Sequence, residues 1–223
     1  MEHTLKSFDL ALSTLMNSTT RMAEQVQVMV TESGKALLAH DVDLARRVVE
    51  SDLLVDRDYE AVRAQCLEIL TRFHPVAGDL RQVIAIEHSA GDLERAADHA
   101  KSIAKRAISG LDGVMTEQSA ALFTRLHAAV VGAIEDANDA LIRRDPDLAQ
   151  RVIRADRQID EIHDDLFHLV MAGPKRSAAR MPSDVHLLFA AKSLERIGDH
   201  ATNIAEEAMF MSKGASPSAT RDD

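Results

Sequence analysis

The chain contains an internal repeat, and this repeat limits the folds that are open to it. Residues 41–49 align with residues 145–153 at an offset of 104, and residues 93–100 align with residues 194–201 at an offset of 101. Matches of this kind, in the same order along both halves, indicate two copies of one structural unit. The change in offset between the two matches places a length difference in the loops, not in the units themselves.

Glycine, proline and aromatic residues are too few for a sheet. The chain has 9 glycines and 5 prolines among 223 residues, with 6 phenylalanines, 1 tyrosine and no tryptophan. A sheet needs frequent turns and favours aromatic and β-branched side chains, whereas this composition favours long helices. Breaks near His40, His74, residues 110–113, Asp145 and residues 171–182 divide the chain into six segments. We therefore predict an all-α protein of six long helices.

The apolar pattern indicates that these helices pack as bundles. In the first and third segments, apolar and small residues recur at alternating steps of three and four, which is the stripe that a bundle helix buries. Short loops require antiparallel neighbours, so each repeat is predicted to form a three-helix bundle. We expect one bundle over residues 3–110, a second over residues 114–212, and a disordered tail over residues 213–223.

Charge and cysteine content restrict the setting of the protein. The formal net charge is −10, and no segregated basic patch is present, so binding to nucleic acid or to an anionic membrane surface is not expected. A single cysteine, Cys66, excludes an intramolecular disulfide framework and is expected to be a small core residue. Because the first residues do not resemble a signal peptide and no apolar run approaches about 20 residues, we expect a soluble, cytoplasmic protein.

Paired acidic residues are the most informative candidates for function. Each repeat contains two pairs of carboxylates at positions i and i+4, which lie on one face of a helix. The pairs are Asp52 with Asp56, Glu94 with Asp98, Asp156 with Asp160, and Glu195 with Asp199. Asp52 also falls on the apolar stripe of its helix, and an inward-facing carboxylate needs a counter-charge, hydrogen bonds or a metal ion.

The distance of each pair from its hairpin turn predicts two acidic clusters. In the first repeat, both pairs lie about 30 Å from the turn at His74, given a rise of about 1.5 Å per residue. In the second repeat, the two pairs are again level with each other. Four carboxylates at one height suit hard or borderline cations, so we predict sites for divalent or trivalent metal ions such as iron, manganese, zinc or magnesium.

Other interpretations of the acids stay open at this point. They could be neutralised by arginines, or they could form an acidic groove for a basic partner; the candidate arginines are Arg57, Arg95, Arg157 and Arg196. A metalloenzyme is a further alternative, but the H-E-x-x-H motif and the E-x-x-H pair of di-iron bundles are absent. His99 and His200 are expected to be outer or surface groups. Glu32 and Asp136 correspond at an offset of 104 on the first helix of each repeat; they are candidates to complete the acidic sites, but we favour solvated charges.

Residues 93–100, 194–206 and 74–81 resemble the PhoU family of bacterial phosphate-transport regulators, and the likeness extends over about residues 3–212. The resemblance implies an all-α pair of three-helix bundles, often dimeric, without established catalytic activity. It also implies metal binding at Glu94, Asp98, Glu195 and Asp199, with Asp52, Asp56, Asp156 and Asp160 opposite. Ala97 departs from the E-R-I-G-D pattern that Gly198 completes in the second repeat.

The same resemblance implies a function and a set of partners. Members of the family act as negative regulators of the phosphate-starvation response and of phosphate uptake. They link the ATPase subunit of the phosphate ABC transporter to a sensor histidine kinase. We therefore expect a cytoplasmic signalling adaptor, peripheral to the membrane through its partners and homodimeric. The alternatives are a carboxylate-site metalloenzyme and a metal-free helical bundle.

Overall fold

The structure is a computed structural model that describes residues 2–109, 115–172 and 181–213. These residues form six α-helices, and the all-α prediction is confirmed. The helices are α1 (Glu2–Ala39), α2 (Val42–Phe73), α3 (Ala77–Ile108), α4 (Glu117–Arg143), α5 (Pro146–Ala172) and α6 (Met181–Lys213). The predicted linker at 110–113, the tail from residue 214 and the basic residues of the last hairpin loop (Lys175, Arg176 and Arg180) lie outside the described residues.

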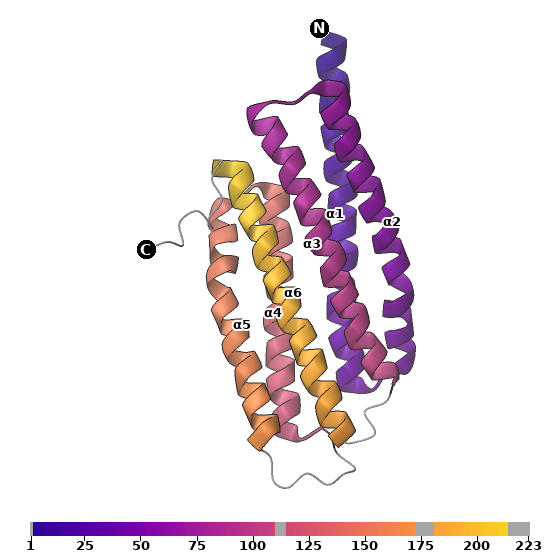
Figure 1. Ribbon diagram of the computed structural model, residues 1–223, viewed down its shortest axis with the longest axis vertical. Helices are drawn as coiled ribbons and strands as arrows, with labels where there is room; N and C mark the ends of the chain where they lie inside the picture. Colours follow the sequence, from indigo (N-terminus) through magenta and orange to yellow (C-terminus); the bar gives the residue numbers. More distant parts are fainter. Residues whose placement is uncertain (1, 110–114, 173–180, 214–223) are drawn as a thin grey trace.

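Helices α1 to α3 form one three-helix bundle and α4 to α6 form the second, which confirms the predicted tandem arrangement (Figure 1). The two bundles lie side by side, because α3 packs along α6 and α1 packs along α4. A single cluster of buried hydrophobic residues runs through both bundles. The two repeats therefore share one hydrophobic core and are not independent domains joined by a linker.

Local signals in the sequence explain where the helices begin and end. The Asp41 side chain accepts a hydrogen bond from the backbone N–H of Leu44 at 2.9 Å and caps the start of α2. Asp145 caps α5 in the same way through the N–H of Leu148, at 3.0 Å. His74 and Arg144 adopt left-handed backbone conformations, with φ of 50° and 55°, where α2 and α4 end. The side chains of Asp41 and Asp145, and the backbone N–H of Arg144, satisfy backbone groups that a helix terminus leaves unpaired.

The predicted stripes are buried. All eight stripe positions of the third helix are buried. In the first helix the stripe positions Phe8 and Leu12 are half-buried. The remaining stripe positions of that helix are buried, and they are Leu15, Thr19, Met22, Val26, Met29, Ser33 and Ala36. The buried stripe of α3 is Val83, Ile86, Ala90, Leu93, Ala97, Ala100, Ala104 and Ala107. Alanine at five of these eight positions allows α3 to approach its neighbours closely, which is what the contact with α6 requires.

The α1–α4 contact has a pseudo-two-fold arrangement. The imidazole of His127 lies over Gly34, and its Nε2 hydrogen-bonds the carbonyl of Val30 at 3.1 Å. On the other side of the pseudo-axis, Asn138 donates to the carbonyl of Ala23 at 3.4 Å. With the offset of 104, His127 corresponds to Ala23 and Asn138 to Gly34. A large polar residue of the second repeat therefore packs on a small residue of the first at both positions.

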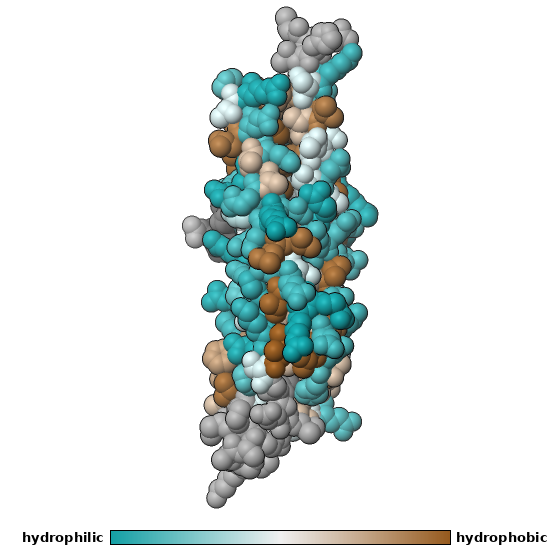
Figure 2. Space-filling model, turned by 90° about the vertical axis from the view of Figure 1, so that its right-hand side faces the viewer, coloured by the Kyte–Doolittle hydropathy of each residue, from teal (hydrophilic) through white to brown (hydrophobic). Residues whose placement is uncertain are grey.

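The outer surface is mostly hydrophilic. Figure 2 shows the side on which α2 lies, where apolar patches are scattered among polar residues. Several large apolar residues are exposed, including Leu53, Leu54 and Leu67 of α2. None of the helices within the described ranges has an apolar stretch long enough to cross a bilayer.

Candidate functional site

In the first repeat, α2 and α3 bring their acidic pairs to the same level. Asp52 is buried, with 2% of its surface exposed, and its carboxylate forms an ion pair with Lys101 of α3. The ammonium of Lys101 also lies 3.6 Å from the carboxylate of Asp98, three residues earlier on the same helix. Lys101 therefore connects the two acidic pairs and supplies the counter-charge that the inward-facing Asp52 requires.

The remaining carboxylates of this first cluster influence one another electrostatically. Burial raises the pKa of Glu94, and repulsion from Asp98, then from Asp56 and Asp52, raises it further. Arg95 acts in the opposite direction. These four acids from two helices are therefore close enough to interact, as the levels along the hairpin predict. Asp56 and Asp98 are exposed, whereas Glu94 is half-buried.

The second repeat reproduces the arrangement with α5 and α6. Burial raises the pKa of Asp199, with added repulsion from Glu195 and Asp156. Burial also raises the pKa of Asp160, followed by repulsion from Asp156 and Glu195. Because each helix contributes acids that act on the other, the four residues form a second cluster. Close packing at this level includes Gly198, where an added Cβ would lie 3.2 Å from the Ile159 side chain.

Glu195 has one carboxylate oxygen that is paired and one that is not hydrogen-bonded. Lys192 donates to Oε1 at 2.6 Å. Oε2 is buried, and no hydrogen-bond partner for it is found among the described residues; the Nε of Arg196 lies 4.0 Å away. A buried anionic oxygen without a hydrogen bond is costly, and a cation at this position would satisfy it. The donor set of the second cluster therefore fits a metal ion chemically.

The described part of the chain contains no group of three His, Cys, Asp or Glu side chains arranged closely enough to hold a metal ion. The structure thus brings the predicted acids together as two clusters, and metal binding stays a prediction. Sequence reasoning missed Lys101 and Lys192, because it sought counter-charges among arginines. Their spacing of three residues from Asp98 and Glu195 is a helical pairing that could have indicated them.

Histidines lie where the two repeats meet. The rings of His99 and His200 are stacked across α3 and α6, with centroids 5.7 Å apart. His200 Nδ1 lies 2.8 Å from a carboxylate oxygen of Asp92, and Asn203 donates to the same oxygen at 3.0 Å. Burial lowers the pKa of His99, and the nearby His200 and Arg196 lower it further. These side chains join the two repeats to each other; His99, His200 and Asp92 are half-buried, whereas Asn203 is exposed.

Three further candidate residues from the sequence are Cys66, Glu32 and Asp136. Cys66 is buried in the core, as predicted, and burial raises the pKa of its thiol to about 12. Glu32 is half-buried on α1, and Asp136 is exposed on α4, where it lines a shallow groove with Arg151 of α5. Neither Glu32 nor Asp136 is among the charges that shift the pKa of the clustered acids.

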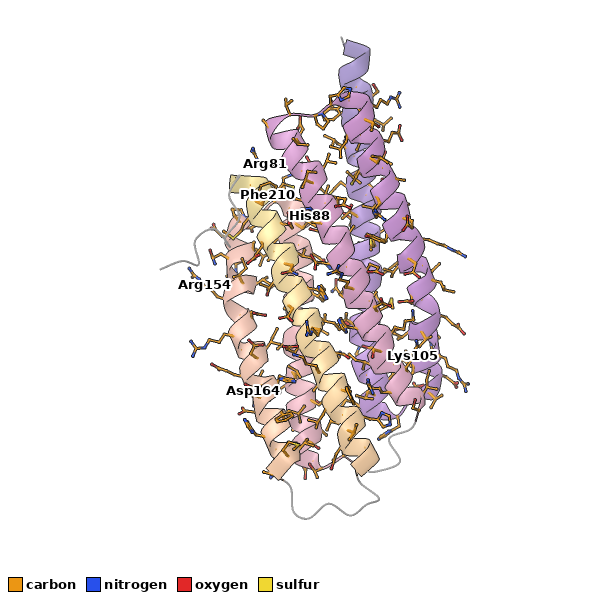
Figure 3. All side chains as sticks on the ribbon, viewed as in Figure 1. Arg81, His88, Lys105, Arg154, Asp164 and Phe210 are labelled. Atoms are coloured by element: carbon orange, nitrogen blue, oxygen red, sulfur yellow. The ribbon has the colours of Figure 1, made fainter. Side chains whose placement is uncertain are left out.

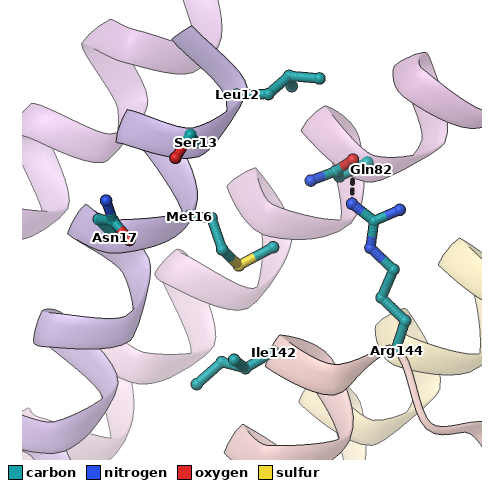
Figure 4. A pocket seen from close by; sticks show the side chains of 7 residues that line it. All are labelled: Leu12, Ser13, Met16, Asn17, Gln82, Ile142 and Arg144. Atoms are coloured by element: carbon teal, nitrogen blue, oxygen red, sulfur yellow. Dashed lines mark hydrogen bonds between the residues drawn. The ribbon is translucent and has the colours of Figure 1, made fainter. Parts of the chain in front are cut away.

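A pocket of about 290 Å³ lies away from the acidic clusters, between α1, the start of α3 and the end of α4 (Figure 4). Its apolar side chains are Leu12, Met16 and Ile142. The guanidinium of Arg144 donates to the buried Gln82 side chain at 2.6 Å. This hydrogen bond connects the end of α4 to α3, and so joins the two repeats. We therefore interpret the pocket as a gap at the contact between the repeats and not as a ligand site.

Comparison with known proteins accounts for both repeats. The PhoU domain model matches residues 19–107 and again residues 123–208. The chain is 35% identical over 221 residues to a "Phosphate-specific transport system accessory protein PhoU homolog" of Zymomonas mobilis, covering 98% of this chain and 92% of the relative. It is 29% identical over 216 residues to the Escherichia coli protein named "Phosphate-specific transport system accessory protein PhoU", covering 96% and 88%.

Solved structures give the same result. The crystal structure of PhoU from Pseudomonas aeruginosa superposes with a TM-score of 0.89 at 30% identity, over 93% of this chain and 100% of that one. A second, described as the phosphate transport system regulatory protein PhoU from Streptococcus pneumoniae, gives a TM-score of 0.85 at 25% identity, over 94% and 98%. With two domain matches, a shared fold and relatives covered over nearly their whole length, the chain belongs to the PhoU family.

Proposed function

We propose that this protein is an accessory and regulatory protein of phosphate transport that represses the phosphate-starvation response. In this role it acts in the cytoplasm as an adaptor, without catalysis, between the ATPase subunit of a phosphate ABC transporter and a sensor histidine kinase. The observation that carries the proposal is the full-length likeness to proteins named for phosphate-specific transport, with both copies of the acidic motif present.

The architecture suits an adaptor. Helices of 27 to 38 residues present long outer faces, and partner recognition by helices commonly uses such faces. The shared core joins the two bundles, so a partner bound at one repeat is held at a fixed position relative to the other. A homodimer would double these faces, and we include dimerisation in the proposal.

We further propose that the acidic clusters bind metal ions that neutralise their mutual repulsion. Glu195, Asp199, Asp156 and Asp160 would hold the cation in the second repeat. Glu94, Asp98, Asp52 and Asp56 are the equivalent set in the first repeat. Carboxylate oxygens suit iron, manganese, magnesium or zinc. Support comes from the raised pKa of Asp160 and Asp199 and from the unsatisfied Oε2 of Glu195.

A metal-free structural cluster is the second candidate, and one observation favours it. Lys101 already neutralises Asp52 in the first repeat, and Lys192 contacts Glu195 in the second. Metal analysis of protein purified without chelator separates the two candidates. Bound metal that Asp199→Ala removes supports the metal site; absence of metal, with no change in stability for that variant, supports ion pairing.

The partner proposal has its own test. Purified protein is mixed with the transporter ATPase and with the cytoplasmic part of the kinase, at low and at high phosphate. We expect a complex with each. If neither complex forms under either condition, the adaptor function is wrong for this protein, whatever the state of the acidic clusters.

A further inference from the structure

Four large apolar side chains are exposed at the end of the second bundle where α5 stops and α6 starts. They are Phe167 and Met171 of α5, and Val185 and Phe189 of α6, with exposed fractions between 40% and 53%. We call these four residues the apolar shelf. Exposed aromatic and aliphatic residues grouped on one face commonly mark an interaction site.

The helix geometry places the α5 half of the shelf on the same face as the acidic residues of α5. Asp160, Asp164, Phe167 and Met171 follow one another at steps of three and four, which keeps them on one side of α5. Helices α5 and α6 are antiparallel, and Ile159 lies against Gly198. Counting eight residues along α5 and nine back along α6 from this contact brings Phe167 level with Phe189.

The first repeat shows that the fold does not require apolar residues at the two phenylalanine positions of the shelf. The equivalents of Met171 and Val185 are Leu67 and Ile84, which are also apolar. With the two repeat offsets, Phe167 corresponds to Arg63 and Phe189 to His88. Arg63 lies 3.7 Å from the Glu87 carboxylate and within 5.4 Å of the Tyr59 ring centroid. His88, which is labelled on α3 in Figure 3, pairs with Glu207 of α6 at 2.9 Å. The same scaffold is therefore stable with charged, ion-paired side chains.

In the second repeat, the pair equivalent to His88 and Glu207 is Phe189 and Arg106, and it is a cation–π contact. Glu207 corresponds to Arg106, and the guanidinium of Arg106 lies 4.5 Å from the Phe189 ring centroid. A cation over the ring fixes one face of Phe189 and leaves the rest of it exposed. Two aromatic residues thus stand on the second repeat where the first carries an arginine and a histidine.

Negative charge lies beside the shelf. Residues 156–171 contain five carboxylates and one arginine, a balance of −4, whereas the equivalent residues 52–67 contain four carboxylates and two arginines, a balance of −2. The one arginine, Arg157, already pairs with Glu161 at 3.1 Å. Asp164 lies on the lower half of α5, within this acidic margin (Figure 3). The α5 side of the surface thus combines apolar anchors with a net negative charge, although His163 lies 3.5 Å from Asp164. On the α6 side, Lys192 and Arg196 follow Phe189 at steps of three and four, so the excess of negative charge is confined to α5.

We propose that the apolar shelf binds an amphipathic helix of a partner protein that carries lysine or arginine beside its apolar face. This deepens the adaptor function proposed above and rests on it for the identity of the partner. A helix fits because Phe167 with Met171, and Val185 with Phe189, are each one turn apart along neighbouring helices. A second copy of this acidic chain, or an anionic membrane, would meet like charge at the α5 margin.

The first test uses a basic probe, an 18-residue helical peptide of leucine and lysine, with a leucine and glutamate peptide as its control. We expect the basic peptide to slow hydrogen exchange in residues 160–172 and 183–190, and the acidic peptide to have no effect. Protection located elsewhere, or absent, overturns the proposal.

Variants locate the binding energy. The double variant Phe167→Gln with Phe189→Gln is expected to weaken peptide binding about tenfold or more, because it removes two aromatic anchors. The control is Leu67→Gln, at the first-repeat position equivalent to Met171, which should change affinity less than about twofold. Equal affinities for the double variant and the wild type contradict the proposal. Circular dichroism confirms that each variant folds.

Two further experiments test the contribution of the negative charge on α5 and the identity of the partner protein. Asp164→Asn should slow association with the basic peptide, whereas Glu60→Gln, the equivalent change in the first repeat, should not. With the ATPase and the kinase, failure of the wild type to bind either refutes the adaptor function. If the wild type binds both and the double phenylalanine variant binds equally well, the adaptor function stands and the shelf is wrong.

Discussion

Replacing Lys101 by methionine tests the first acidic cluster most directly. The change keeps the length of the side chain and removes the ammonium, so the buried carboxylate of Asp52 loses its ion-pair partner. Removing one member of a buried ion pair costs about 3–5 kcal/mol. Because 26% of the Lys101 side chain is exposed and water can partly replace it, we expect the low end, about 3 kcal/mol.

This loss is large enough to measure with confidence. For a protein of this size, about 3 kcal/mol lowers the Tm by about 6–12 °C. The assay is urea unfolding followed by circular dichroism, in the presence of a chelator. Asp52→Asn with Lys101→Met should recover much of the loss, because no buried charge is left unpaired. Lys105→Met, one turn further along α3, is the control and should change stability by less than about 0.5 kcal/mol.

The same variant separates a metal site from an ion pair. If the four acids of the first repeat hold a cation, Mn²⁺ should stabilise Lys101→Met more than it stabilises the wild type, since the metal takes the place of the ammonium. The variant that also lacks the Asp52 charge should respond less. A cost below about 1 kcal/mol for Lys101→Met, or an equal cost for the double variant, would refute the reasoning about Asp52.

Three further predictions concern the second cluster and the contact between the repeats. Gly34→Ala places a Cβ 2.4 Å from the His127 ring and should cost about 1–3 kcal/mol in urea unfolding, whereas Gly132→Ala, which meets nothing within 4 Å, should be neutral or stabilising; equal effects would contradict the close α1–α4 contact. Burial lowers the pKa of His127, so the unfolded chain takes up a proton that the folded one does not as the pH falls below about 6.5, and stability should be lost there. This loss of stability, measured by thermal melts between pH 7 and 5.5, should be smaller in His127→Gln. An equal loss in the variant would show that His127 is not the group responsible. Burial and repulsion raise the pKa of Asp199, so its protonated form favours folding at low pH and this contribution is lost as the pH rises through the raised value. Asp199→Asn should therefore raise the Tm of metal-free protein at pH 7 and leave it unchanged near pH 3.5, and a lower Tm at pH 7 without metal would contradict the repulsion.

Much of the architecture follows from patterns that one helix contains by itself. In the stripe from Leu15 to Ala36 and in the stripe of α3, apolar and small residues recur at alternating steps of three and four. Such helices remove this apolar surface from water by packing the stripes against one another. The internal repeat then predicts two bundles. The levels of the acidic pairs follow from the rise per residue and from the position of the hairpin turn.

Contacts between distant segments were not predictable in the same way. The stacking of His99 on His200, the packing of His127 on Gly34 and the pairing of Phe189 with Arg106 each depend on how the second bundle lies against the first. Periodicity shows which face of a helix is buried, but it does not show which other helix covers that face. The ion pair between Lys101 and Asp52 was missed for a related reason, since these residues lie 49 positions apart in the chain and only the packing of α3 on α2 brings them together.

The amino-acid sequence alone determined that this protein is helical, that it is duplicated, and that its acids occur in level pairs, because these properties arise from local spacing along a helix. The tertiary structure decided that the bundles share one core, that lysine neutralises Asp52, and that an aromatic surface stands beside the second acidic cluster. Those outcomes depend on the direction in which side chains from separate helices meet, and that direction is set by the packing of the whole chain.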